Sequence, residues 1–94
     1  MTGTNGRDVL IGTEGADVIC GLGNRDTIDG RGGNDIVLGG PGGDSIRGGG
    51  GHDMLFGENG ADSIDSRDGA SGDVVTGGHG GDSIAGDQGD SLTQ

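Results

Sequence analysis

The sequence predicts an all-β repeat fold, in which short strands alternate with glycine-rich turns. Aspartate recurs at intervals of nine residues, and an aliphatic residue follows each of these aspartates two positions later. In addition, 27 of the 94 residues are glycine, which is poorly suited to a helix interior and well suited to tight turns. Repeats this short cannot bury a core alone, so we expect them to stack on one another.

The composition argues against an ordinary packed core. Apolar residues make up 27% of the chain, there is one aromatic residue, and the net charge is -11. Because low hydrophobicity and high net charge are typical of chains that do not fold unaided, we expect folding to depend on a ligand. The negative charge disfavours nucleic acid and anionic membrane surfaces and favours cations. We also expect no membrane insertion, since no stretch has the length and apolarity of a transmembrane helix.

Three positions define each repeat. The aspartates keep strict register in seven copies, at Asp8, Asp17, Asp26, Asp35, Asp44, Asp53 and Asp62. The aliphatic residues that follow them are Leu10, Ile19, Ile28, Val37, Ile46, Leu55 and Ile64. A glycine lies five residues before each aspartate, and a second lies two residues before it in every regular copy except the third, which has Asn24. Asparagine tolerates a left-handed backbone better than most residues, so this exception fits the pattern.

The register changes after Asp62. Asp73 follows eleven residues later and Asp82 nine residues after that, while the last copy is one residue short and places Asp90 in the aspartate position. We therefore interpret 1–94 as a single domain with regular repeats over 3–65, an irregular insertion over 66–76 and further repeats over 77–94.

The repeated unit resembles the nonapeptide G-G-x-G-x-D-x-U-x of the RTX (repeats-in-toxin) calcium-binding family, where U is a large aliphatic residue. The segments "GGPGGDSIR", "GGGGHDMLF" and "GGHGGDSIA" are complete matches, and the chain is similar to short secreted bacterial RTX proteins. The resemblance implies a parallel β-roll, a right-handed β-solenoid with two nonapeptides per turn and about five turns. It also implies that the Gly-Gly-x-Gly-x-Asp part forms a turn and the x-U-x part a short strand.

Calcium ions are expected between stacked turns. Calcium takes six to eight oxygen ligands, more than one aspartate and a few glycine carbonyls can supply, so two turns would complete each site. With two repeats per turn, the seven regular copies form five stacked pairs on two edges, which predicts about five or more Ca²⁺ ions. The candidate carboxylate ligands are Asp8, Asp17, Asp26, Asp35, Asp44, Asp53, Asp62, Asp73 and Asp82. The candidate turn residues that accompany them are Gly6, Gly15, Asn24, Gly33, Gly42, Gly51, Gly60 and Gly80.

The residues that flank the aliphatic position predict two different faces. In odd-numbered copies they are mostly polar, whereas in even-numbered copies they are mostly apolar. The apolar stripe would include Val18, Ile36, Leu38, Met54 and Phe56, and it suggests self-association or docking. The alternative is that these positions carry aliphatic residues for strand propensity alone.

The functional prediction is a secreted, non-enzymatic module that folds on binding Ca²⁺. Stacked carboxylates repel one another without an ion, so the metal-free chain is expected to be disordered. No complete dinucleotide-binding fingerprint or EF-hand loop is present. Two alternatives stay open: an export and folding tail of a larger secreted enzyme or toxin, and a structural or adhesive β-roll, including an ice-binding one.

Overall fold

The computed structural model describes residues 2–66, 72–86 and 91–93 and contains only short strands as regular structure. Each strand has three residues, and in β2 to β8 the central residue is buried while its two neighbours are more exposed. Their bounds are β1 (Val9–Ile11), β2 (Val18–Cys20), β3 (Thr27–Asp29), β4 (Ile36–Leu38), β5 (Ser45–Arg47), β6 (Met54–Phe56), β7 (Ser63–Asp65), β8 (Val74–Thr76), β9 (Ser83–Ala85) and β10 (Ser91–Thr93). Within the described ranges, no helix has the length and apolar character needed to cross a membrane.

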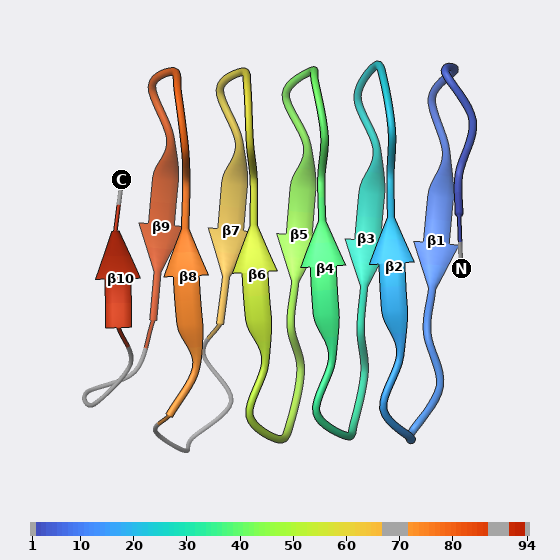
Figure 1. Ribbon diagram of the computed structural model, residues 1–94, viewed down its shortest axis with the longest axis vertical. Helices are drawn as coiled ribbons and strands as arrows, with labels where there is room; N and C mark the ends of the chain where they lie inside the picture. Colours follow the sequence, from blue (N-terminus) through green and yellow to red (C-terminus); the bar gives the residue numbers. More distant parts are fainter. Residues whose placement is uncertain (1, 67–71, 87–90, 94) are drawn as a thin grey trace.

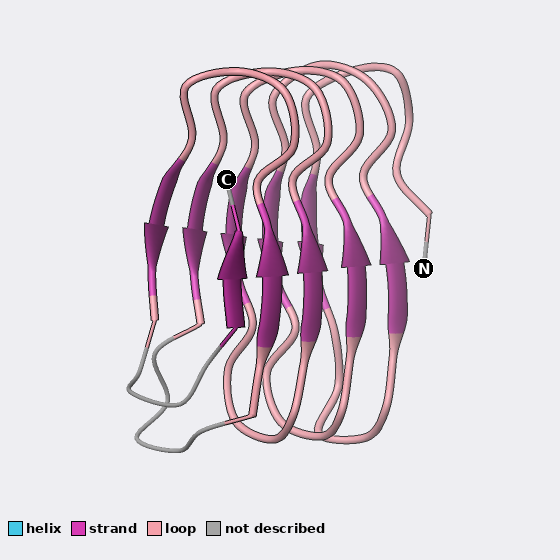
Figure 2. Cartoon of the chain, turned by 60° about the vertical axis from the view of Figure 1, so that its left-hand side comes forward, coloured by secondary structure: helices cyan, strands magenta, loops and turns pink. Residues whose placement is uncertain are grey.

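The strands form two parallel five-stranded sheets, one of odd and one of even strands. The orders are β1-β3-β5-β7-β9 and β10-β8-β6-β4-β2, so the chain changes sheet at every turn (Figures 1 and 2). Each strand pairs in register with the strand two repeats later, as Leu10 does with Ile28 and Ile28 with Ile46. This confirms the predicted parallel β-roll with two repeats per turn. The stack has about four turns, close to the five expected.

The aliphatic residue at the centre of each strand from β1 to β9 points between the sheets. The inward residues form one continuous core, with Leu10 and Ile84 packed against its ends. The fully or almost fully buried members are Ile19, Ile28, Val37, Ile46, Leu55, Ile64 and Val75. The molecule measures 32 × 27 × 13 Å, so this aliphatic column is thin.

From the third to the seventh repeat, the turns have a left-handed backbone at two positions. Four residues before the aspartate, φ is 68° at Leu22, 64° at Arg31 and 69° at Glu58. The φ angle is also positive at the glycines in the equivalent positions of other turns. Two residues before the aspartate, Asn24 has φ of 69° and Gly42 of 107°. The expectation that Asn24 replaces a glycine in a left-handed turn is therefore confirmed.

The irregular segment does not disturb the stack. Leu55 pairs with Val75 and Ile64 with Ile84, so both sheets continue past the insertion in the same register. The extra residues are accommodated between strands, where residues 67–71 lie outside the described residues, as does Asp90.

Candidate functional site

The repeat aspartates form two columns inside the roll, one at each edge. One column contains Asp8, Asp26, Asp44, Asp62 and Asp82, and the other contains Asp17, Asp35, Asp53 and Asp73. The six from the third to the eighth repeat are at most 2% exposed. Buried carboxylates are rare unless they are paired or coordinate a metal, so these columns are the candidate site.

A backbone hydrogen bond links each aspartate to the next in its column. The amide N–H of Asp26 donates to Oδ1 of Asp44 at 2.9 Å, and that of Asp44 donates to Oδ1 of Asp62 at 2.8 Å. The same bond spans the insertion, where Asp62 donates to Asp82 at 2.8 Å. One carboxylate oxygen of each interior aspartate is thus fixed by the turn stacked against it, which sets the orientation of the side chain.

The second carboxylate oxygen of several column aspartates is buried without a hydrogen-bond donor. Within the described residues, this holds for Oδ2 of Asp26, Asp35, Asp44, Asp62 and Asp82. Burial of a negatively charged oxygen is strongly unfavourable when no other group replaces its hydrogen bonds to water. The arrangement therefore provides a series of oxygen atoms that require a positive partner.

For Asp26, Asp35, Asp44 and Asp62, this oxygen and a backbone carbonyl of the next turn both border a space that only glycine leaves open. A Cβ placed on Gly39 would lie 2.6 Å from Oδ2 of Asp44 and 2.9 Å from the carbonyl oxygen of Gly57 in the next turn. A Cβ on Gly21 would lie 2.7 Å from both Oδ2 of Asp26 and the carbonyl oxygen of Gly39. Carboxylate and carbonyl oxygens are the ligands that Ca²⁺ takes in proteins, so the residues present fit this ion.

Burial and neighbouring charge shift the titration of the column carboxylates. Burial raises the pKa of Asp44 to about 7, against the opposing hydrogen bond from Asp26, and the charge of Asp62 raises it further. Burial likewise raises the pKa of Asp62 to about 6, with the charge of Asp82 adding to it. The pKa values of Asp26 and Asp35 are raised mainly by burial as well. Without a cation, these groups therefore bind a proton more readily than an exposed aspartate does.

The predicted turn residues bring further carbonyls between consecutive turns. The carbonyl oxygen of Gly15 would lie 2.5 Å from a Cβ placed on Gly33, its counterpart in the next turn. The carbonyl oxygens of Asn24, Gly33, Gly42 and Gly60 make the same approach to Gly42, Gly51, Gly60 and Gly80. Most of the predicted turn residues therefore stack over one another next to the aspartate columns.

The first turn of each column differs from the rest. Asp8 and Asp17 are half-buried, and their Oδ2 atoms accept hydrogen bonds from the amides of Thr4 at 2.6 Å and Thr13 at 2.7 Å. For Gly6, which belongs to the first turn, the nearest atom to an added Cβ is Oγ1 of Thr4 at 3.5 Å, and no stacked carbonyl approaches it.

The glycine five residues before each aspartate was missed as a site residue by the sequence reasoning. The structure places Gly21, Gly30 and Gly39 directly beside an aspartate Oδ2 and a carbonyl of the next turn. The signal that could have identified them was present, because this glycine occurs in all seven regular copies whereas the other glycine position admits Asn24.

Acidic side chains do not form a conventional metal cluster. In the parts of the chain that the structure describes, no group of three or more His, Cys, Asp or Glu side chains is arranged to hold a metal ion. Any cation in the columns must therefore take many of its ligands from backbone carbonyls, as expected for one aspartate per turn.

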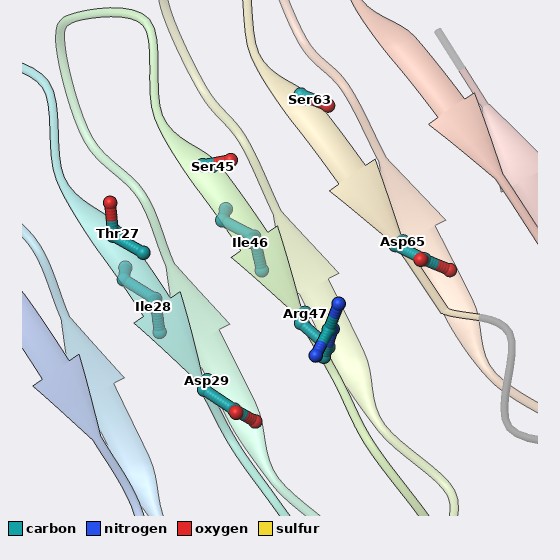
Figure 3. Close-up of a pocket in the computed structure, with 8 residues that line it drawn as sticks. All are labelled: Thr27, Ile28, Asp29, Ser45, Ile46, Arg47, Ser63 and Asp65. Carbon is teal, nitrogen blue, oxygen red and sulfur yellow. The ribbon is translucent and has the colours of Figure 1, made fainter.

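The outer faces of the two sheets differ as predicted. On the odd sheet, a hollow of about 410 Å³ is lined by the hydroxyls of Thr27, Ser45 and Ser63 and, along the opposite strand ends, by charged side chains (Figure 3). On the even sheet, Val18 is 55% exposed and Met54 43% exposed. Ile36 is also exposed, while Leu38 and Phe56 of the same face are half-buried.

Comparison with known proteins agrees with the geometry of the aspartate columns. The family model described as the RTX calcium-binding nonapeptide repeat (4 copies) matches residues 2–37 and 38–71, well over half of the chain. A comparison with curated proteins found no match. The chain therefore belongs to the RTX calcium-binding nonapeptide repeat family, and its β-roll is a calcium-binding repeat module.

Proposed function

We propose that this module folds when Ca²⁺ enters its two aspartate columns. The observation that carries the proposal is the buried Oδ2 without a donor, which faces a carbonyl of the next turn and recurs in Asp26, Asp35 and Asp44. Bound calcium supplies the positive charge that such a buried oxygen lacks.

In the proposed site, the residues of each turn have different roles in binding an ion. The aspartate Oδ2 provides the charge, while the amide bond to Oδ1 keeps the carboxylate oriented toward the neighbouring turn. The glycine five residues earlier keeps the space open, and the turn carbonyls supply neutral oxygens. By repeat position, the carboxylate ligands we propose are those of Asp26, Asp35, Asp44, Asp53, Asp62, Asp73 and Asp82.

The energetic balance supports coupling between ion binding and folding. The aliphatic column is one side chain wide in each sheet, and glycine loses more conformational entropy on folding than any other residue. The buried carboxylates oppose folding until their charge is neutralised. Calcium binding free energy then becomes folding free energy, as in other small metal-dependent domains.

Far-ultraviolet circular dichroism during a calcium titration tests the proposal. We expect a cooperative transition from coil to β structure, reversal by a chelator and no equivalent transition with Mg²⁺, which requires closer, octahedral ligands and keeps its water. A chain that is equally β-structured in chelator would show that the aliphatic column folds alone.

We propose that folding takes place outside the cell, where RTX repeats of secreted bacterial proteins meet calcium. Extracellular calcium modules bind with dissociation constants of about 10⁻⁴–10⁻³ M. A transition midpoint in this range would support extracellular folding, and it would suit a stand-alone module and the tail of a larger secreted protein alike. A midpoint below about 10⁻⁶ M, in the range of intracellular sensors and buffers, would contradict it.

We also propose that the apolar face of the even sheet binds a second copy of the chain. Val18, Ile36 and Met54 are exposed there, and a hollow of about 360 Å³ lies beside Leu38 and Phe56. The strand residues of this face carry no charge, so two acidic molecules can approach through it.

Sedimentation velocity of the calcium-bound protein tests this association. Wild type is expected to form a dimer, and Phe56→Asp is expected to abolish it. The control, Ser45→Asp, adds the same charge to the odd sheet and should leave the dimer intact. A wild-type protein that stays monomeric at high concentration would exclude the interface.

A further inference from the structure

The first turn at each edge has a different backbone from the turns stacked on it. In interior turns, the residue four positions before the aspartate has a left-handed backbone, whether it is Leu22, Arg31 or Glu58. Thr4 and Thr13 occupy this position in the first two repeats, and neither has a positive φ. A β-branched residue is strongly disfavoured in the left-handed region, so threonine directs these two turns into another form.

In that form, threonine satisfies the whole carboxylate of its own repeat. The amide of Thr4 donates to Oδ2 of Asp8 at 2.6 Å, and Oγ1 of Thr4 lies 3.1 Å from both Oδ1 and Oδ2. The amide of Gly6 donates to Oγ1 of Thr4 at 3.1 Å, which holds the hydroxyl in place.

The second repeat has the same arrangement at the other edge. The amide of Thr13 donates to Oδ2 of Asp17 at 2.7 Å, its Oγ1 lies 3.1 Å from each carboxylate oxygen, and the amide of Gly15 donates to Oγ1 at 3.2 Å. The first turns at the two edges make the same hydrogen bonds. The arrangement therefore depends on threonine four residues before the aspartate and not on the edge where the turn lies.

The position in the stack explains why these two aspartates need a local partner. Each later column aspartate that the structure describes receives an amide N–H at Oδ1 from the aspartate of the preceding turn, as Asp26 does from Asp8 at 2.9 Å. Among the described residues, no aspartate amide donates to Asp8 or Asp17. In Asp8 and Asp17, the threonine hydroxyl takes the place of that donor at Oδ1. The threonine amide donates to Oδ2, the atom that has no donor in Asp26, Asp35 and Asp44.

We propose that Thr4 and Thr13 close the first turn of each column against calcium, so that the series of ions begins at Asp26 and Asp35. An amide N–H presents its positive end to Oδ2, in the place where a cation would otherwise neutralise that oxygen. The proposal rests on calcium binding in the columns. Hydrogen bonds define seven stacked aspartate pairs, and five remain after the pairs Asp8–Asp26 and Asp17–Asp35 are removed. The calcium-bound protein should therefore hold five ions.

Native mass spectrometry of the calcium-loaded protein counts the ions directly. Asp8→Asn with Asp17→Asn should retain five, because those carboxylates already have their partners. The matched interior pair, Asp44→Asn with Asp53→Asn, changes the same group at each edge and should hold at least two fewer. If the first pair loses ions as the interior pair does, the threonine closure is wrong. If the interior variant loses no ions, the proposal that calcium binds in the columns is wrong instead.

Substitution of the threonines tests their role separately. Thr4→Gly with Thr13→Gly introduces the residue found in the turns of Gly40 and Gly49 and should raise the count from five toward seven. Thr4→Ser with Thr13→Ser keeps the hydroxyl and should keep five. A glycine variant that folds with calcium and still holds five ions would show that threonine does not exclude them. The aspartate variants keep the proposal testable if the glycine variant does not fold.

Discussion

The aliphatic column at the centre of the roll and the aspartate columns at its edges are buried to the same extent and respond to burial in opposite ways. Leu55 is 0% exposed and Asp44 is 1% exposed, although one side chain is apolar and the other is acidic. Removing Leu55 from water favours folding, whereas removing the Asp44 carboxylate opposes folding until a cation or a proton neutralises it. On the proposed function, the strands supply cohesion and the turns supply the dependence on calcium. The predictions below test this division.

The largest effect is expected from truncating the aliphatic column. Leu55→Ala should lower the free energy of unfolding at saturating calcium by about 2–5 kcal/mol, because it removes buried methyl groups and leaves a cavity in a thin core. Urea denaturation measures the change. Ser45→Ala, an exposed change on the odd sheet, should stay within about 0.5 kcal/mol of wild type. Equal effects of the two substitutions would mean that the inward column is not the source of cohesion.

Neutralising one interior aspartate should weaken folding in the presence of calcium but should not weaken it in chelator. Asp44→Asn removes a charged ligand, so we expect the calcium midpoint of folding to rise by at least about tenfold, the lower end of the losses seen when supporting groups of metal sites are changed. In chelator, the neutral amide avoids burial of a charge and should leave as much β structure as wild type or more. Circular dichroism measures both, with Asp29→Asn on the outer face as control. An unchanged calcium midpoint would contradict the division.

A methyl group in the space beside the carboxylate should destabilise the calcium-bound roll. In Gly39→Ala, the new Cβ would lie 2.6 Å from Oδ2 of Asp44, which should lower the free energy of unfolding by about 1–3 kcal/mol. Gly50→Ala is the matched control, since a Cβ at Gly50 meets nothing within 4 Å. Urea denaturation should therefore separate the two variants, and equal stability would indicate that the space beside Asp44 is not used.

The smallest effect is expected from pH. The pKa of Asp44 is raised to about 7 and that of Asp62 to about 6, both from 3.8, so protonation favours the folded state of the metal-free chain. This stabilisation is complete below about pH 4 and is lost as the pH rises through 6 to 7. In chelator, the β-sheet signal should therefore increase from about pH 8 to about pH 4. With calcium present, protons compete for the same oxygens, and the calcium midpoint should rise as the pH falls.

The variant Asp44→Asn with Asp62→Asn provides the control for the pH experiment. It should weaken the response to acid in chelator, because two of the groups that bind protons on folding are gone. An unchanged response would assign the acid effect to other carboxylates.

Much of the fold could be predicted from the sequence because one period specifies it. The nine-residue spacing places a single aliphatic residue at the centre of each strand, and the structure confirms that Ile28 and Ile46 stack in register. The separation of the aspartates into two columns followed from two repeats per turn. Asn24 could be assigned to a left-handed turn because few residues other than glycine tolerate one.

Other features depend on contacts between turns, which the period does not specify. The role of Gly39 is visible only when Asp44 and the carbonyl of Gly57 are placed beside it. The closure by Thr4 is visible only from its bonds to Asp8, whereas Asp26 accepts the amide of Asp8. The sequence also does not show that a two-residue lengthening between Asp62 and Asp82 leaves the pairing of β7 with β9 intact.

The central claim is that calcium occupies the buried aspartate columns, and anomalous diffraction from crystals of the calcium-bound protein tests it most directly. The account predicts anomalous peaks beside Oδ2 of the interior aspartates, including Asp26, Asp35 and Asp44, and none beside Asp8 or Asp17. Peaks confined to carboxylates on the outer face, such as Asp29, with no ion beside the interior Oδ2 atoms, would contradict it.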